Sequence, residues 1–417
     1  MKRLLTITIV LISLVNSFAQ SWTPLTSGTT KQLRHVFFVD ANTGWVVGEG
    51  GTILKTTNGG TSWSQQTLSG KDLLIGCCFV NSTTGWIGGD GGVLKTTDGG
   101  ATWNYQTGPT GITKLYFLNA STGWAVGGAD GSTPVYGDIY KTTDGGTTWT
   151  KQTNSSTWSR FYGVQFADAN NGWAYTESNG LLIKTSDAGT TWTPQLNYGT
   201  ATKIRGMHFL DKDNGWVVGY SNTSGIVLKT TNGGAQWTDA APGLQFAVTQ
   251  VQFVSKTLGW ALGNGGPAGR GVINTTDGGA TWKLTSTGTA VLNNLFMLND
   301  KSGWAVGEAG VIYKYNATTG VSNHAKNTAI NTFSLEQNYP NPFNPSTTIN
   351  YSIASDGFVT LKVYNVLGNE VAALVNKEQA AGNYSVNFNA AGLSNGVYLY
   401  TLTSGNYSST RKLLLLK

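Results

Sequence analysis

The chain has 417 residues, with 15 tryptophans, 56 glycines, three histidines and two cysteines, and its formal net charge is +6. Two of the positive charges stand at residues 2 and 3, and the other Lys and Arg residues form no block of like charge. This spread argues against a nucleic-acid partner, because nucleic-acid-binding proteins usually cluster their Lys and Arg residues. The histidines His35, His208 and His324 are scattered along the sequence, which argues against a metal site. We therefore expect no metal, no cofactor and no nucleic acid.

Residues 1–19 have the pattern of a secretory signal peptide. Two cations precede an apolar run over residues 4–15, and small residues occupy the cleavage positions before Gln20. The apolar run is too short for a membrane span, so we expect an exported chain without one. The adjacent Cys77 and Cys78 cannot reach ordinary disulfide geometry, and we interpret both as small core residues.

Tryptophans recur in two positions at a period of roughly 40 residues, which is typical of a β-propeller. One set directly follows a glycine: Trp45, Trp86, Trp124, Trp173, Trp216, Trp260 and Trp304. The other set closes a turn with the pattern Thr-Thr-Asp/Asn-Gly-Gly-x-x-Trp: Trp63, Trp103, Trp149, Trp192, Trp237 and Trp282. Trp22 stands alone near the start, and only Trp158 fits neither position.

Each copy contains four stretches with strand character. In the first, apolar residues alternate at period two, which indicates a strand with one buried face. The position between them varies, and we interpret it as a less demanding environment: Phe37, Cys78, Tyr116, Gln165, His208, Gln252 and Phe296. The Gly-Trp strand and a third strand follow, and an Asx-Gly turn leads to the fourth. Such turns supply positive φ and bond their own backbone, so we predict a structural role for Asn58, Asp98, Asp144, Asp187, Asn232 and Asp277.

The number of copies predicts the architecture. Seven Gly-Trp strands occur but only six complete turns, because the last copy loses the pattern after Tyr315. The segment around Trp22 is similar to the fourth strand around Trp192. We therefore predict an all-β, seven-bladed and monomeric propeller over residues 20–316, closed by its N-terminal strand, which leaves no open sheet edge.

A second domain follows the last copy. Residues 317–332 are small and polar, which suits a linker. Over residues 333–417, short alternating segments separated by glycines predict a small Ig-like β-sandwich. The predicted strands are Thr348–Ile353, Val359–Tyr364, Tyr384–Phe388, Val397–Leu402 and Lys412–Leu416.

These motifs resemble known families. The Asx-Gly turns look like the Asp-box (BNR) repeat of sialidases, and the fuller unit over residues 21–316 resembles the photosystem II stability/assembly factor-like propellers. Residues 333–417 resemble a type A C-terminal sorting domain of the type IX secretion system, carried among others by Asn341, Pro342, Phe343, Asn344 and Pro345. The last resemblance implies recognition by the type IX translocon and a secreted or cell-surface location.

Departures from the repeat indicate where a ligand binds. The entries to the first strands and the loops between second and third strands share one face, which we call the entry face; the Asx-Gly turns lie on the opposite, box face. Irregular loops on the entry face are residues 129–138, 221–225 and 264–270. Binding residues concentrate on such loops, and Trp and Arg are frequent anchors. We predict a protein- or glycan-binding surface formed by Trp158, Arg160, Tyr162, Arg34 and Arg205.

Three other interpretations remain open. Trp158 caps its own loop and the arginines pair with nearby acids, in which case these residues are structural. Alternatively, the chain is a secreted glycoside hydrolase that uses two of the entry-face carboxylates, Glu49, Asp90, Glu177 and Glu308. Since three of these stand at one equivalent position beside a Gly-rich turn, we assign no catalytic residue. The third possibility is a purely structural surface component.

Overall fold

A computed structural model describes residues 20–317 and 333–416, apart from residues 69, 71, 129–136, 153–157, 223, 265–269, 287–289, 339, 340, 342 and 406. The predicted signal peptide, most of the predicted linker and Pro342 lie outside these residues. The chain divides into two compact units, residues 1–321 and 322–417, and the division falls within the predicted linker.

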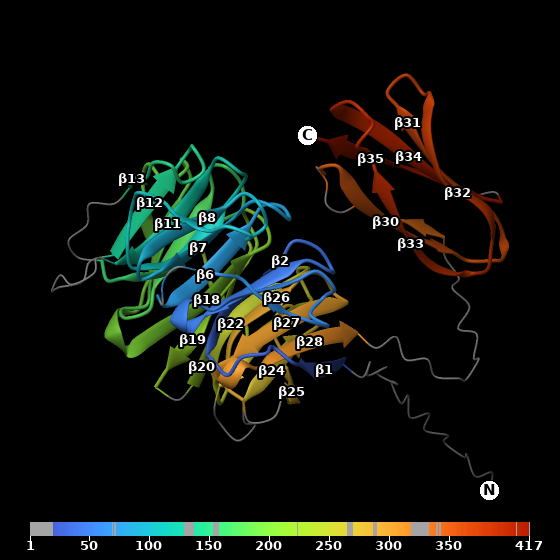
Figure 1. Ribbon diagram of the computed structural model, residues 1–417. Helices are drawn as coiled ribbons and strands as arrows, with labels where there is room; N and C mark the ends of the chain where they lie inside the picture. Colours follow the sequence, from blue (N-terminus) through green and yellow to red (C-terminus); the bar gives the residue numbers. More distant parts are fainter. Residues whose placement is uncertain are drawn as a thin grey trace, which may run out of the picture. The chain divides into compact units, whose positions relative to one another are not determined.

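The first unit contains seven four-stranded antiparallel sheets, which confirms the seven-bladed propeller (Figure 1). Blade 1 consists of β2 (Leu33–Phe38), β3 (Gly44–Gly48), β4 (Ile53–Thr56) and β5 (Ser64–Gln65). Blade 2 consists of β6 (Leu74–Phe79), β7 (Gly85–Gly89), β8 (Gly92–Thr96) and β9 (Asn104–Tyr105). Blade 3 consists of β10 (Ile112–Phe117), β11 (Gly123–Gly128), β12 (Gly137–Thr142) and β13 (Thr150–Lys151).

The remaining blades repeat this order. Blade 4 consists of β14 (Phe161–Phe166), β15 (Gly172–Thr176), β16 (Leu181–Thr185) and β17 (Thr193–Asn197). Blade 5 consists of β18 (Thr202–Phe209), β19 (Gly215–Ser221), β20 (Ser224–Thr230) and β21 (Thr238–Asp239). Blade 6 consists of β22 (Ala247–Phe253), β23 (Gly259–Asn264), β24 (Gly271–Thr275) and β25 (Lys283–Ser286). Short 3₁₀ turns occur at η1 (Glu49–Gly51), η2 (Gly199–Ala201) and η3 (Glu308–Gly310).

Blade 7 combines the two ends of the propeller. It contains β26 (Leu292–Met297), β27 (Ser302–Gly307) and β28 (Ile312–Ala317), and its outer strand is the N-terminal β1 (Gln20–Leu25). Strand β1, dark blue in Figure 1, pairs with the orange β28 so that Trp22 lies opposite Tyr315. Their ring centroids are 5.3 Å apart. The predicted closure by the N-terminal strand is confirmed.

The Gly-Trp pair has a packing reason. In six of the seven blades the tryptophan stacks on a phenylalanine in the first strand of the next blade, as Trp45 stacks on Phe79 at 3.6 Å between ring centroids. The same Phe79 meets the edge of Trp103 at 6.0 Å. A Cβ on Gly85 would lie only 2.2 Å from the Phe79 ring, so only glycine leaves room for this ring. The repeated pair therefore provides the hydrophobic contact between neighbouring blades.

The Asx-Gly turns also join blades. In the turn of blade 2, the Asp98 carboxylate accepts hydrogen bonds from the Thr102 N–H at 2.9 Å and the Thr96 hydroxyl at 2.8 Å. The carbonyl of Gly99, whose φ is +71°, accepts one from Trp45 Nε1 of blade 1 at 3.2 Å. The Lys55 ammonium donates to the same carbonyl at 2.8 Å. Each such turn therefore closes a hairpin in its own blade and accepts a hydrogen bond from the tryptophan of the preceding blade.

The second unit is a β-sandwich, as predicted. One sheet contains β29 (Ser334–Leu335), β30 (Ser346–Ile353) and β33 (Gly382–Asn389). The other has the order β32 (Glu370–Gln379), β31 (Gly357–Asn365), β34 (Gly396–Ser404) and β35 (Tyr407–Leu415). The sequence prediction missed β32, because this edge strand buries only Val375 and has two register shifts against β31. Phe343 of the predicted sorting motif is buried in the core of this unit.

Candidate functional site

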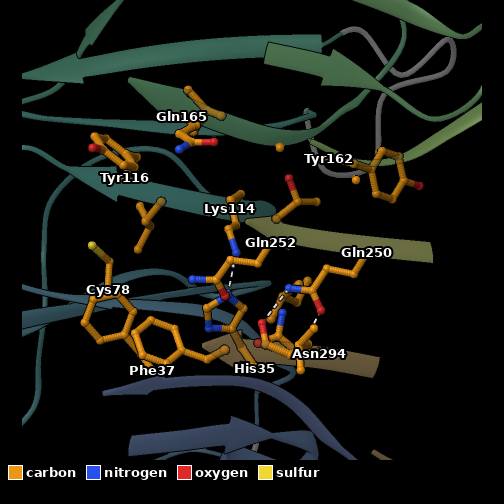
Figure 2. Close-up of a pocket in the computed structure, with 18 of the residues that line it drawn as sticks. His35, Phe37, Cys78, Lys114, Tyr116, Tyr162, Gln165, Gln250, Gln252 and Asn294 are labelled. Atoms are coloured by element: carbon orange, nitrogen blue, oxygen red, sulfur yellow. Dashed lines mark hydrogen bonds between the residues drawn. The ribbon is translucent and has the colours of Figure 1, made fainter. Parts of the chain in front are cut away.

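The first strands of all seven blades surround a cavity of about 480 Å³ at the centre of the propeller (Figure 2). Residues from β2, β6, β10, β14, β18, β22 and β26 line it. A cavity of this volume is in the range that holds small molecules. The propeller channel is thus the candidate functional site.

A β-bulge recurs in the first strand of every blade, near the end where the strand begins. The bulged residue stands in a register shift, as Arg34 does between Leu33 and His35. A bulge re-aims one side chain, and here all seven such side chains line the cavity. We call them the bulge ring: Arg34, Ile75, Thr113, Tyr162, Arg205, Thr249 and Asn293. The bulge ring marks the entry-face mouth of the channel.

Deeper in the channel, polar side chains bridge the inner strands of adjacent blades. Gln165 of β14 donates to the Phe209 carbonyl of β18 at 2.8 Å and accepts from the Phe209 N–H at 3.0 Å. Gln252 of β22 makes the same two bonds with Met297 of β26, both at 2.8 Å. Bridges of this kind satisfy backbone groups that no sheet ladder reaches. The variable position that we had interpreted as undemanding is therefore a channel wall, and several of its side chains join blades.

Three of the five predicted binding residues lie in the bulge ring. Tyr162 is 38% exposed, and Arg34 and Arg205 are partly exposed beside the mouth. Arg34 forms an ion pair with Glu49 at 2.8 Å, and Arg205 forms one with Glu177. The structure thus brings these three side chains to one opening and gives both arginines an acidic neighbour.

The other two predicted residues do not line the cavity. The Trp158 ring packs edge-on against Phe161 at 6.0 Å, in the core between blades 3 and 4. Arg160 donates from its guanidinium to the Gly111 carbonyl at 3.0 Å. Both residues therefore have contacts within the blades, beside the channel rather than inside it.

Sequence reasoning missed Lys114. This lysine on β10 extends into the cavity and contacts Nε2 of the buried His35 on β2 (Figure 2). Burial lowers the pKa of His35 well below its ordinary value, and the Lys114 ammonium lowers it further. Burial also lowers the pKa of Lys114. A signal was present in the sequence, since Lys114 is the only lysine directly after a bulge-ring position.

The carboxylates considered for hydrolysis lie outside the channel. Among the described residues, no aspartate or glutamate lines the cavity. Glu49 and Glu308 begin equivalent 3₁₀ turns, η1 and η3, as the shared position in the repeat indicated. Across the described part of the chain, no group of three His, Cys, Asp or Glu side chains is arranged to hold a metal ion. Nor does that part contain a helix with the length and hydropathy needed to cross a bilayer.

Two family models match the chain. Residues 14–157 match the family described as photosynthesis system II assembly factor YCF48. Residues 337–416 match the secretion system C-terminal sorting domain, which indicates type IX secretion to the cell surface or the extracellular space. No curated protein matches the chain.

Solved structures with similar folds have different functions. The structure described as YCF48 bound to D1 peptide is 20% identical with a TM-score of 0.58, covering 71% of this chain and 94% of that one. PorZ of Porphyromonas gingivalis, described as a surface component of the type IX secretion system, is 13% identical with a TM-score of 0.51, covering 94% of this chain and 60% of PorZ. A GH74 xyloglucanase from Xanthomonas campestris is 11% identical with a TM-score of 0.51, covering 93% and 66% of the two chains. At these identities the similarity shows the fold alone.

Proposed function

We propose that this exported propeller is a non-catalytic binding module that holds a protein or glycan at the cell surface through its entry face. The type IX translocon delivers it by recognising residues 333–417. The observation that carries the proposal is the bulge ring, which places Arg34, Tyr162 and Arg205 together at the mouth of the channel.

The chemistry of this mouth suits recognition. Tyrosine and arginine combine a broad apolar or planar surface with hydrogen-bond donors, and they are frequent energetic anchors of interfaces. The scaffold beneath them is rigid, because the first strands are bridged side chain to backbone around the channel. A rigid site loses little conformational entropy on binding. Since the similar YCF48 structure is described with a bound peptide, an extended protein segment is a suitable first class of ligand to test.

A pull-down tests this proposal. The mature chain, residues 20–417, is used to capture partners from outer-membrane and medium fractions of the host. We expect the double variant Arg34→Ala/Arg205→Ala to lose the captured partner, because it removes two mouth anchors. The matched control is Lys256→Ala/Lys301→Ala, which removes the same charge from exposed turns of the box face. Equal capture by wild type and both variants would contradict an entry-face site.

The alternative is a glycoside hydrolase, which the GH74 fold similarity brings into consideration. Its candidate residues are the entry-face acids, two of which, Glu49 and Glu177, are ion-paired with the mouth arginines. Sialyl and glucan substrates offered to the purified protein distinguish the two functions. Turnover that disappears on Glu49→Gln or Glu177→Gln substitution favours the enzyme, whereas binding without turnover favours the module.

A further inference from the structure

Lys114 occupies a position that other blades use differently. Directly after the bulge-ring residue, the seven blades carry His35, Gly76, Lys114, Gly163, Gly206, Gln250 and Asn294. Gln250 and Asn294 each form a hydrogen bond to the backbone of the next blade. Gln250 donates to the Leu295 carbonyl, and the Asn294 side-chain oxygen accepts from the Val36 N–H at 3.0 Å. Between blades 3 and 4 the neighbouring Thr113 does this instead, donating to the Phe161 carbonyl at 2.6 Å. Lys114 is therefore not needed as a bridge.

The lysine side chain instead crosses the channel wall of blade 2. It passes beside Gly76, where a Cβ would lie 3.8 Å from Lys114 Cδ, an ordinary van der Waals contact. The ammonium ends at His35 of blade 1, inside the cavity (Figure 2). A long cationic side chain thus lies along the wall of the channel cavity rather than extending into bulk water.

Among the residues that the structure describes, no negative charge in the channel compensates this cation. The mouth arginines pair with Glu49 and Glu177, while Lys114 has no carboxylate partner among the described residues. Burial raises the pKa of the facing Cys77 and Cys78 thiols and of the Tyr116 hydroxyl, which keeps all three groups neutral. A partly desolvated ammonium without a counter-charge favours an incoming anion.

The rest of the cavity suits a small molecule with an apolar part. Phe37 and Phe296 lie side by side on its wall, with ring centroids 5.1 Å apart. His208 also lines it, and its Nδ1 accepts from the Phe253 N–H at 3.3 Å. The neutral imidazole therefore carries its proton on Nε2, which is a donor. Cation, donor and aromatic wall together match a compact organic acid.

We propose that the channel binds a small organic acid whose carboxylate pairs with the Lys114 ammonium and whose body fills the space beside Phe37 and Phe296. This goes beyond the proposed entry-face function, because the acid occupies the channel interior and not the outer surface. Its failure is also distinguishable, since a partner captured through the mouth does not require Lys114.

Calorimetry with the full mature chain tests the proposal. The probes are pairs that differ mainly in the carboxylate: benzoate and benzamide, succinate and succinamide, galacturonate and galactose. We expect at least one acid to bind tenfold or more tightly than its neutral counterpart. Lys114→Met should abolish that preference and Lys114→Arg should keep it. The control Lys203→Met removes a lysine that lies outside the cavity lining, and it should leave the preference unchanged.

The remaining outcomes overturn the proposal. These are the absence of any acid preference in the wild type, or a preference that persists in Lys114→Met. A melting curve of each variant separates loss of binding from loss of folding. If Lys114→Met does not fold, the charge-conserving Lys114→Arg still tests the proposal, because it should keep the preference for the acid. A last arm compares a peptide with a free C-terminus and the same peptide amidated. Binding of the free peptide alone, with no small acid bound, would assign the site to a chain end instead.

Discussion

At the residue scale, the channel wall shows how one backbone requirement is met by different side chains. Inner strands of neighbouring blades lie close without a continuous ladder, so side chains supply the missing hydrogen bonds. Gln165 and Gln252 do so with both ends of their amide. The equivalent His208 makes one such bond, to the Phe253 N–H. Its burial lowers the pKa of His208 from 6.5 to about 4.

This shift predicts a pH-dependent stability. The pKa of His208 is about 4 in the folded protein and near 6.5 when unfolded, so its stabilising effect is complete above pH 6.5. It is lost as the pH falls towards 4, because protonation then favours the unfolded chain. His208→Gln, which imitates Gln165 and Gln252, should remove this dependence. At about 1.4 kcal/mol per pKa unit, the two proteins should diverge by on the order of 2–3 kcal/mol over this range.

Urea unfolding of both proteins from pH 7 to pH 4 measures this divergence. His35, whose pKa is also lowered, is present in both proteins and cancels in the comparison. Parallel pH profiles would show that burial of His208 does not penalise its charged form.

At the scale of elements, neighbouring blades are joined by a hydrogen bond from a tryptophan to a turn, and the contact between blades 6 and 7 is the exception. Six Gly-Trp tryptophans donate to a carbonyl in the Asx-Gly turn of the next blade. Blade 7 has no such turn, and Trp260 Nε1 of blade 6 has no partner among the described residues. Strand β1 places Trp22 at this seam instead, where Tyr315 contacts both Trp22 and Trp260. Blades 6 and 7 are therefore held together here by apolar packing, whereas the other six contacts between blades also have this hydrogen bond.

We expect Trp22→Ala to weaken the ring. Trp22 is only 8% exposed, and loss of a buried tryptophan costs about 3–5 kcal/mol. Trp158→Ala is the control, because this residue is only half-buried and packs between blades 3 and 4, away from the closing blade; it should cost about 1 kcal/mol. Chemical unfolding measures both changes. A loss from Trp158→Ala as large as that from Trp22→Ala would argue against closure by β1.

The sequence predicts strands and turns well where they recur at a fixed spacing in the repeat. Seven copies allow each strand, the Asx-Gly turn and the β1 closure to be identified, because the same spacing recurs. The single-copy strand β32 has no such support and was missed. The bulge ring was seen only in part, through the matching positions of Arg34 and Arg205. Period-two alternation tells which residues face inward, but a bulge changes this by one residue.

At the scale of the whole molecule, the two units differ in what they match and contain. The C-terminal unit matches the secretion system C-terminal sorting domain, and its sandwich core buries Phe343 of the predicted motif. The propeller supplies a rigid ring with a channel. The place of Lys114 in the channel was not predictable, because its ammonium contacts His35 from another blade. Contacts across 79 residues of chain follow from the circular arrangement and not from any local pattern.

The most direct test of an entry-face binding site is photo-crosslinking from the channel mouth. A photoreactive phenylalanine replaces Tyr162 in one protein and Ser82, an exposed box-face residue, in another. Each protein is mixed with the host outer-membrane fraction and irradiated, and adducts are identified by mass spectrometry. The account predicts a discrete adduct from position 162 and none from position 82. Adducts only from position 82, or none from either position, would contradict it.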